Sequence, residues 1–167
     1  MFIKNKLNLL SVTIGLFVLI FLAGCISSSI DKNKIIQIAE NIEKALEKKK
    51  IDLFMENISY NYSDSNGGTY DNHINGLPEK IFSNLEETED LVDGIFSIFK
   101  IEPKVTIPES DLVIVNIYAS GKMEIRITLK ACIAWVICTN LYNETTEYNV
   151  DFIKEVDEWK IISMMEI

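Results

Sequence analysis

The chain changes its hydrophobic period about halfway along. Apolar residues return every three or four positions over residues 35–46 and again over residues 73–99, and this spacing predicts amphipathic helices. Over residues 111–119, 123–131 and 148–156 apolar and polar residues alternate instead, which predicts half-buried strands. Helices followed by a meander of long strands predict an α+β domain, in which N-terminal helices pack on one face of a curved antiparallel sheet.

Capping and turn residues set the expected boundaries of these elements. Asp31 is the expected N-cap of the first helix, and lysines 48–50 end it as solvated cations at the negative end of the helix dipole. Residues 58–63 alternate and are rich in tyrosine, so they predict a further strand. The expected turns and loops lie at residues 64–68, at Gly121-Lys122, at residues 140–144 and at Asp157-Glu158.

The N-terminus has the organisation of an export signal. A positive segment with Lys4 and Lys6 precedes a largely apolar segment, residues 7–22, and small residues follow. This order is that of a cleaved signal peptide. An uncleaved transmembrane helix is the alternative, since residues 7–26 reach the ~20 residues that span a bilayer. Both alternatives put residues 31–167 outside the cytoplasm, because the lysines stay on its inner side.

The segment Leu22-Ala23-Gly24-Cys25 resembles the lipobox of bacterial and archaeal lipoproteins. The resemblance implies that residues 1–24 are removed as a signal peptide and that the thiol of Cys25 carries a diacylglyceryl-type lipid. Residues 25–32 then form a short lipidated tether to a domain that covers residues 33–167. Two or more acyl chains hold a protein durably in a bilayer. The resemblance therefore implies a cell-membrane protein, anchored through the lipid on Cys25, with its domain facing outside the cytoplasm.

The charge balance excludes one class of partner. The formal net charge of −9 becomes −11 once Lys4 and Lys6 leave with the signal peptide. A chain this acidic repels phosphate backbones, so nucleic-acid binding is not expected. Anionic lipid headgroups repel it as well, and membrane attachment must come from the lipid anchor rather than from surface charge.

Two further cysteines, Cys132 and Cys138, remain after Cys25. Exported proteins often hold such a pair as a disulfide. The apolar run 131–138 instead predicts one continuous strand, in which the six residues between the cysteines span ~20 Å. Bridged cysteines need Cα atoms within roughly 7 Å of each other. We therefore expect two buried thiols and no disulfide between them.

Three segments resemble the cone-shaped nuclear transport factor 2-like superfamily. They are residues 58–70, in which tyrosine, serine and aspartate precede two glycines, the alternating residues 111–139, and the closing residues 150–161 with Trp159-Lys160-Ile161. The resemblance covers residues 33–167 and implies a cone, in which helices cap a bent sheet around an apolar pocket. The superfamily includes enzymes, binding proteins and dimerisation modules, so the resemblance does not select a function.

Aromatic side chains are the candidate ligand-binding residues. Tyr60, Tyr62, Tyr118 and Trp135 lie on predicted strands, where they line a pocket of the cone or, in the alternative, fill its core. His73 is the single histidine and is expected at the surface. No Asp–His or Asp–Tyr pair matches a catalytic pattern, and no spacing of metal ligands is present in the sequence. We therefore predict no catalytic residue, no metal site and no cofactor.

The sequence as a whole predicts an extracytoplasmic lipoprotein with a non-enzymatic domain that binds a ligand or another protein. Apolar residues on both faces of residues 131–138 predict a homodimer through that part of the sheet, or an envelope protein partner. Two alternatives stay open. One is a cone-pocket enzyme doing acid–base chemistry on a small apolar substrate, which requires a buried carboxylate with a raised pKa that faces the cavity. The other is a purely structural envelope lipoprotein.

Overall fold

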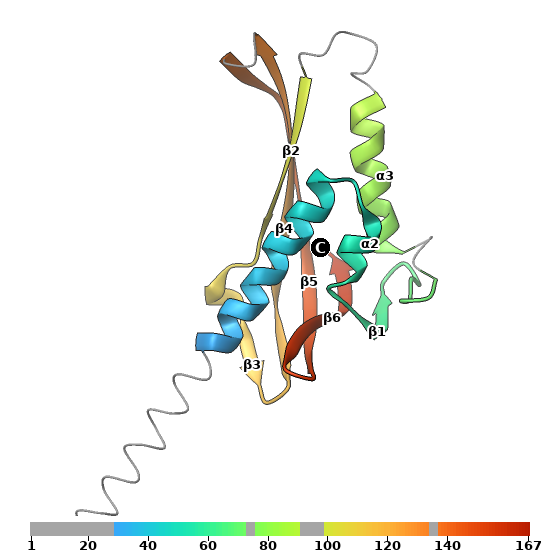
Figure 1. Cartoon of the computed structure of the whole chain (residues 1–167), viewed down its shortest axis with the longest axis vertical. Coiled ribbons are helices and arrows are strands. Elements are labelled where there is room, and N and C mark those ends of the chain that lie inside the picture. Colours follow the sequence, from blue (N-terminus) through green and yellow to red (C-terminus); the bar gives the residue numbers. More distant parts are fainter. Residues whose placement is uncertain (1–28, 73–75, 91–98, 134–136) are drawn as a thin grey trace, which may run out of the picture.

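The computed structural model describes residues 29–72, 76–90, 99–133 and 137–167 (Figure 1). The first helix is described over residues 29–47. The elements that follow are α2 (Ile51–Met55), β1 (Ile58–Asp64), α3 (Leu77–Asp90), β2 (Phe99–Thr106), the short 3₁₀ helix η1 (Glu109–Asp111), β3 (Val113–Val115), β4 (Tyr118–Ile133), β5 (Ile137–Glu155) and β6 (Glu158–Glu166).

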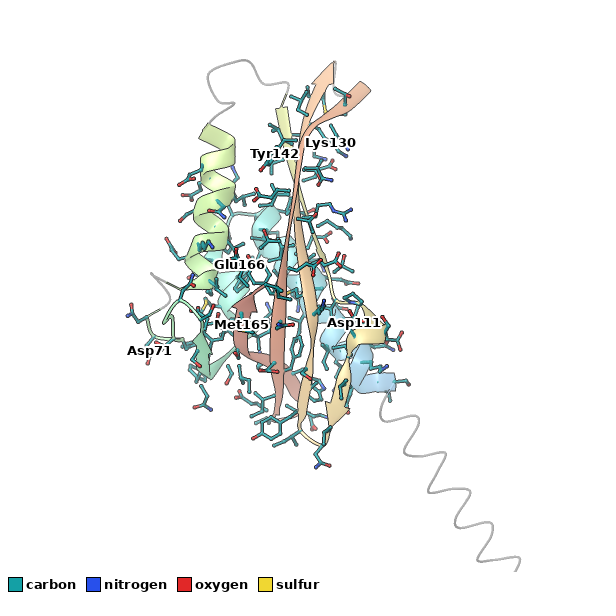
Figure 2. The ribbon with its side chains drawn as sticks, turned by 180° about the vertical axis from the view of Figure 1, so that it is seen from behind. Asp71, Asp111, Lys130, Tyr142, Met165 and Glu166 are labelled. Carbon is teal, nitrogen blue, oxygen red and sulfur yellow. A yellow bond between two sulfur atoms is a disulfide. The ribbon has the colours of Figure 1, made fainter. Side chains whose placement is uncertain are left out.

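One six-stranded sheet forms the body of the domain. Its order is β1-β6-β5-β4-β2, and β3 pairs with the start of β4. Neighbouring strands are antiparallel except β1 and β6, which run parallel with Ile58 opposite Ile161. The helices lie on one side of the sheet, which is seen from its other side in Figure 2. The predicted α+β architecture is confirmed, and the described sheet differs from the expected one in its parallel pair.

The core lies between the helices and the inner face of the sheet. Period-two alternation on β4 turns Met123 and Ile125 inward, where both are buried, and leaves Arg126 exposed on the other face. The buried side of the first helix consists of Ile35, Ile38, Ala39, Ile42, Ala45 and Leu46. Aromatic side chains fill much of the remaining interior: Phe54, Tyr62, Phe82, Tyr148 and Phe152. Side chains thus occupy the interior of the cone.

Gly121 packs the chain closely instead of turning it. The predicted turn at Gly121-Lys122 is wrong, because β4 runs through both residues. The chain reverses between β3 and β4, where Asn116 has a φ of 58°, a left-handed conformation that asparagine tolerates. A Cβ atom at position 121 would lie 2.9 Å from the Cδ2 atom of Leu112. Glycine therefore lets the Leu112 side chain pack closely here, and a larger residue would displace it.

The strands extend further than the alternation predicts. The predicted loop at residues 140–144 is wrong, because β5 runs through it and pairs with β4 on either side of a bulge. The predicted turn at Asp157-Glu158 lies one residue earlier, at Val156 and Asp157, which both have positive φ angles. Two such residues form the hairpin turn that suits twisted strands.

The helical part of the prediction also needs corrections. The first helix already includes residues 29–32 of the predicted tether, so Asp31 is not its N-cap. α3 confirms a helix within residues 73–99, of which 73–75 and 91–98 lie outside the described residues. β2 was not predicted, and it accommodates Pro103 because it forms an edge of the sheet. Among the described helices, none combines the length and the hydrophobicity that crossing a bilayer requires.

Cys132 and Cys138 form a disulfide, and the prediction of two separate thiols is wrong. The two residues lie opposite each other on β4 and β5, with their Cα atoms 4.0 Å apart. Apolar residues on both faces of 131–138 indicated a single strand, but this segment contains the end of one strand and the start of the next, Ile133 being paired with Ile137. A hairpin brings together two residues that a continuous strand keeps apart.

We expect the loss of this disulfide to lower the free energy of unfolding by about 2 kcal/mol, because a short closed loop restricts the unfolded chain. Urea denaturation of the wild-type protein with and without reductant measures the difference. The double variant Cys132→Ser/Cys138→Ser is the control, since reductant should leave its unfolding curve unchanged. Coincident curves for oxidised and reduced wild-type protein would contradict the prediction.

Candidate functional site

A groove of about 750 Å³ opens beside the first helix, where α2 meets β1 and β5 turns into β6 (Figure 1). Parallel pairing of β1 with β6 brings its walls together from distant parts of the chain. The buried side chains of Ile38, Met55 and Ile58 give it an apolar floor. Amide, carboxylate and ammonium groups line it together with the aromatic rings of Tyr60, Tyr70 and Trp159. The groove therefore combines apolar contact area with hydrogen-bonding groups, as ligand sites do.

Tyr60 and Tyr70 form an aromatic lip on this groove. The pairing of β1 with β6 is irregular between Ile58 and Ser63, and in this part of the strand Tyr60 is 78% exposed, whereas Tyr62 is buried. A backbone bridge between Ser63 and Thr69 returns the chain beside β1, and the ring centroids of Tyr60 and Tyr70 lie 4.4 Å apart. Loss of solvation and the hydrogen bond with Tyr60 raise the pKa of Tyr70. The lip offers ring faces and phenol groups to a ligand.

Asn57 fixes the corner between α2 and β1. Its side-chain amide donates to the carbonyl of Leu53 at 3.0 Å, and its Oδ1 accepts a hydrogen bond from Asn41 Nδ2 at 3.1 Å. Its backbone carbonyl accepts the N–H of Ile161 at 2.9 Å. One residue thus ties the first helix, α2 and β6 together, and the groove is preorganised rather than assembled when a ligand arrives.

Acidic groups outnumber basic ones around the groove. The carboxylates are those of Glu56, Glu155, Asp157 and Glu158, and the ammonium groups are those of Lys34 and Lys160. The protein itself engages both lysines: Lys34 Nζ donates to the carbonyl of Asp157 at 3.0 Å, and Lys160 Nζ donates to the carbonyl of Glu56 at 2.7 Å. The groove therefore favours neutral or cationic ligands over anionic ones.

Asp31 anchors the first helix to the sheet next to the groove. Its Oδ1 accepts hydrogen bonds from Lys154 Nζ at 2.8 Å and from the indole Nε1 of Trp159 at 3.0 Å. The hydrogen bond from Lys154 outweighs the effect of burial, so the pKa of Asp31 lies below its ordinary value. Asp31 is an ionised anchor that positions Trp159 in the wall of the groove.

Asp64 organises the loop between β1 and α3. Its Oδ1 accepts the backbone N–H groups of Asn66 at 2.8 Å and Gly68 at 2.9 Å, which confirms the predicted turn. Its Oδ2 accepts the hydroxyl of Tyr62 at 3.0 Å and the N–H of Leu77, the first residue of α3, at 2.8 Å. Burial and the nearby Asp64 carboxylate raise the pKa of Tyr62. This carboxylate is a structural centre whose oxygens are occupied by the protein.

The four aromatic residues suggested by the sequence do not meet in one pocket. Tyr60 lines the groove, whereas Tyr62 is buried in the core. Tyr118 is half-exposed and lines a separate shallow pocket of about 350 Å³ on the sheet. Trp135 lies outside the described residues, as does His73.

Tyr70, Trp159 and Asn57 also line the groove, and the sequence pattern did not predict them as groove residues. A signal for Tyr70 was present, because a turn rich in glycine at residues 64–68 returns the chain toward Tyr60. No local signal could place Trp159 or Asn57, since the parallel pairing of β1 with β6 brings them together. The expected homodimer through residues 131–138 stays a prediction, although the single strand on which it rested is replaced by a disulfide-linked hairpin.

The acid–base alternative requires a buried carboxylate with a raised pKa. Within the described ranges, Asp31 is the buried carboxylate, and its pKa is lowered. Each buried side-chain nitrogen or oxygen in the same ranges has a hydrogen-bond partner. No three His, Cys, Asp or Glu side chains of the described residues are grouped to hold a metal ion. The buried carboxylate of the described ranges therefore lacks the raised pKa that the acid–base alternative requires.

A second groove, of about 540 Å³, lies between the first helix and the β2 edge of the sheet. Its charged side chains pair across this edge. Glu102 accepts from Lys100 at 2.8 Å and also from Lys130, which Figure 2 labels near one end of the sheet. Glu43 lies 3.1 Å from Lys104 Nζ and also accepts the N–H of Val105. These contacts attach β2 to its neighbours and explain the charges without a ligand.

Comparison with known proteins identifies the fold. No protein-family model matches the sequence, and no curated protein matches it. An NTF2-like protein with a cystatin-like fold from Novosphingobium aromaticivorans superposes with a TM-score of 0.52 at 9% identity, covering 87% of this chain and 86% of its own. A nuclear transport factor 2-like superfamily protein from Salmonella enterica serovar Typhimurium gives a TM-score of 0.51 at 9% identity, covering 84% of this chain and 92% of its own. Likeness at such identities concerns the fold alone, and on this basis the described domain has the cone-shaped nuclear transport factor 2-like fold.

Proposed function

We propose that this protein is a lipid-anchored lipoprotein whose domain binds a neutral or cationic polar ligand in the groove beside the first helix. The lipid on Cys25 holds it to the cell membrane, and the domain faces outside the cytoplasm. The observation that carries the binding role is the aromatic lip, in which the exposed ring of Tyr60 lies 4.4 Å from Tyr70 above a preorganised groove.

Cysteine usage supports export and the anchor. Cys132 and Cys138 are joined by a disulfide, a bond that persists in oxidising compartments outside the cytoplasm. Of the three cysteines in the chain, Cys25 is the one that remains for a lipid. It follows Leu22-Ala23-Gly24 as the lipobox requires, and the preceding apolar run supplies the export signal.

The chemistry of the groove supports binding over catalysis. The exposed ring of Tyr60, beside the partly buried ring of Tyr70, loses water-facing apolar area when a ligand covers it, which favours association. Glu155 and Glu158 give the rim its negative charge. The nearby buried carboxylate of Asp31 is paired with Lys154 and has a lowered pKa, whereas a general acid at neutral pH needs a raised one.

Mass spectrometry of membrane-extracted protein tests the anchor. We expect a mature chain that begins at Cys25 and carries added acyl mass, because the peptidase cuts beside the lipidated thiol. The variant Cys25→Ser should remain an unlipidated precursor, and Ser28→Ala, a change of similar size outside the lipobox, should be processed normally. An intact Met1 together with an unmodified Cys25 in the wild-type protein would refute the anchor.

Ligand-observed NMR on the mature protein tests the groove, with uncharged oligosaccharides and lysine-rich peptides as probes. For any probe that binds, we expect Tyr60→Ala to lower the affinity at least tenfold. The variant removes a ring face worth about 1.4 kcal/mol or more of binding free energy. Tyr142→Ala is the matched control, since it truncates another exposed tyrosine that does not line the groove. Equal affinities for wild type and Tyr60→Ala would exclude the lip from the binding site.

A further inference from the structure

Exposed apolar side chains gather at one end of the sheet. They come from β3, from the β3–β4 turn and from the β5–β6 turn: Val113, Val115, Ile117, Tyr118 and Val156. We call this set the apolar tip. Val115 pairs with Tyr118, and the carbonyl of Ile117 accepts the N–H of Lys154 at 2.8 Å. These bonds hold β3, the start of β4 and the end of β5 together, and β3 and the β5–β6 turn lie at the same end of the molecule in Figure 1.

The first helix begins beside the apolar tip. Lys32 Nζ donates to the carbonyl of Glu109 in η1 at 3.3 Å, and Lys34 Nζ donates to the carbonyl of Asp157 in the β5–β6 turn at 3.0 Å. Ile30 adds another half-exposed apolar side chain at this position of the helix. The end of the domain that leads back toward Cys25 is therefore the end that carries the apolar tip.

The chain between the lipid and the helix is short. Four residue steps separate Cys25 from residue 29, where the described helix begins. Even when fully extended they reach at most ~14 Å. A lipid on Cys25 therefore keeps the start of the first helix, and the loops packed against it, close to the bilayer surface.

Val156 breaks two local rules at once. Its φ angle is 46° and that of Asp157 is 69°, and a turn of this kind favours asparagine, aspartate or glycine, while a β-branched residue is strained in it. Its side chain is also 99% exposed, so the apolar surface contributes nothing to the core. Such a residue lowers the stability of the fold in water and contributes no buried area within the chain. Its presence is explained if its side chain is buried in an apolar environment outside the chain.

We propose that the apolar tip inserts into the interfacial layer of the bilayer that holds the Cys25 lipid, and thereby sets the orientation of the domain. The inference rests on the proposed lipid anchor and adds a second, non-covalent contact to it. Aliphatic side chains with a tyrosine among them suit this layer, where one part of the surroundings is apolar and another wet. The acidic charge of the chain restricts the partner to zwitterionic headgroups, which do not repel it.

Fluorescence in vesicles tests the orientation. The mature protein, as processed from the full-length chain in exporting cells, is mixed with phosphatidylcholine vesicles and carries an environment-sensitive fluorophore at Val156→Cys, or at Asn143→Cys in the matched control. Asn143 is exposed on the same strand, β5, but lies away from the apolar tip. We expect a blue-shifted emission at position 156 and quenching by acyl-chain nitroxides at least twofold stronger there than at position 143.

The outcomes separate the two proposals. Vesicle-bound protein with water-like emission and equal quenching at both positions would overturn the apolar tip and leave the anchor intact. Protein that stays in the supernatant would overturn the anchor and the apolar tip together. A blue shift that appears without vesicles and accompanies dimer formation would assign the apolar tip to a second copy of the chain, and would also overturn membrane insertion.

A variant with opposite effects on stability and insertion provides a second test. Val156→Asn supplies a residue that favours the positive φ angle, so we expect the melting temperature to rise by a few degrees. A fluorophore at Ile117→Cys should lose at least half of its blue shift in the same variant. A rise in melting temperature with unchanged fluorescence would show that Val156 has no part in membrane contact.

Discussion

Replacing Asp64 with alanine is expected to lower the free energy of unfolding by about 4 kcal/mol. The carboxylate accepts four hydrogen bonds, three from backbone N–H groups and one from the Tyr62 hydroxyl. Hydrogen bonds to a charged group contribute roughly 1.5–3 kcal/mol each, although their sum is not additive. The variant also leaves the buried Tyr62 hydroxyl without its acceptor. The loop between β1 and the start of α3 should therefore loosen before the sheet unfolds.

Urea denaturation and hydrogen exchange at Leu77 measure this effect. Asp64→Asn keeps an acceptor but loses the charge, and we expect it to cost about half as much. Ser65→Ala is the control, because it changes a side chain in the same turn while keeping the backbone bond from its N–H to Met164. A loss below 1 kcal/mol in Asp64→Ala would mean that the loop is held by contacts other than this carboxylate.

Replacing Asp31 with alanine is expected to cost about 3 kcal/mol, because the variant leaves Lys154 and the indole of Trp159 without their shared acceptor. The pKa of Asp31 is lowered in the folded protein, first by the hydrogen bond from Lys154. A lowered pKa means that the unfolded chain binds the proton more tightly. The stability contributed by Asp31 is therefore complete above its ordinary pKa of 3.8, and it is lost as the pH falls through its lower folded value.

Thermal unfolding between pH 2 and pH 7 checks this dependence. The wild type should lose more stability than Asp31→Asn when the pH falls from about 5 to 2, because the amide does not titrate. Asp71→Asn is the matched control at an exposed carboxylate, and its acid profile should follow that of the wild type. Parallel profiles for wild type and Asp31→Asn would remove Asp31 from the acid sensitivity of the fold.

The sequence predicted the elements whose burial follows a simple period. The inward face of β4 is an example, because residues 123–131 must alternate to fill one side of a sheet. The ends of β4 were harder to predict, because glycine occurs both in turns and at positions of close packing. Gly121 packs against Leu112, while the turn belongs to Asn116. A turn residue identifies a place where the chain can reverse, and tertiary packing decides whether it does.

The disulfide shows why an apolar run can hide a hairpin. Ala134, Trp135 and Val136 separate β4 from β5 and include none of the usual turn residues. Apolar residues on both sides of this segment therefore predict one strand as readily as two. The pairing of Cys132 with Cys138 resolves the ambiguity, because it is possible only between strands that face each other.

Of the residues that line the candidate groove, the sequence pattern predicted Tyr60 but not most of the others. Tyr60 stood out as an aromatic residue on an alternating strand, and the structure exposes it at the rim. Trp159 reaches the same groove because β6 follows a chain reversal and pairs in parallel with β1, a strand about a hundred residues earlier in the sequence. Such long-range pairings are set by the whole sheet, so no local pattern in a single sequence reveals them.

The length of β4 determines how far the domain can extend from the membrane. The strand has 16 residues, from Tyr118 at one end to Ile133 at the other, and at ~3.3 Å per residue it spans about 50 Å. That span is comparable to the full thickness of a bilayer with its headgroups, roughly 40–45 Å. If the chain stands on Tyr118 and its neighbours, the hairpin closed by Cys132 and Cys138 projects above the layer of lipid headgroups. A macromolecule that binds this hairpin would then make its contact well away from the lipid surface.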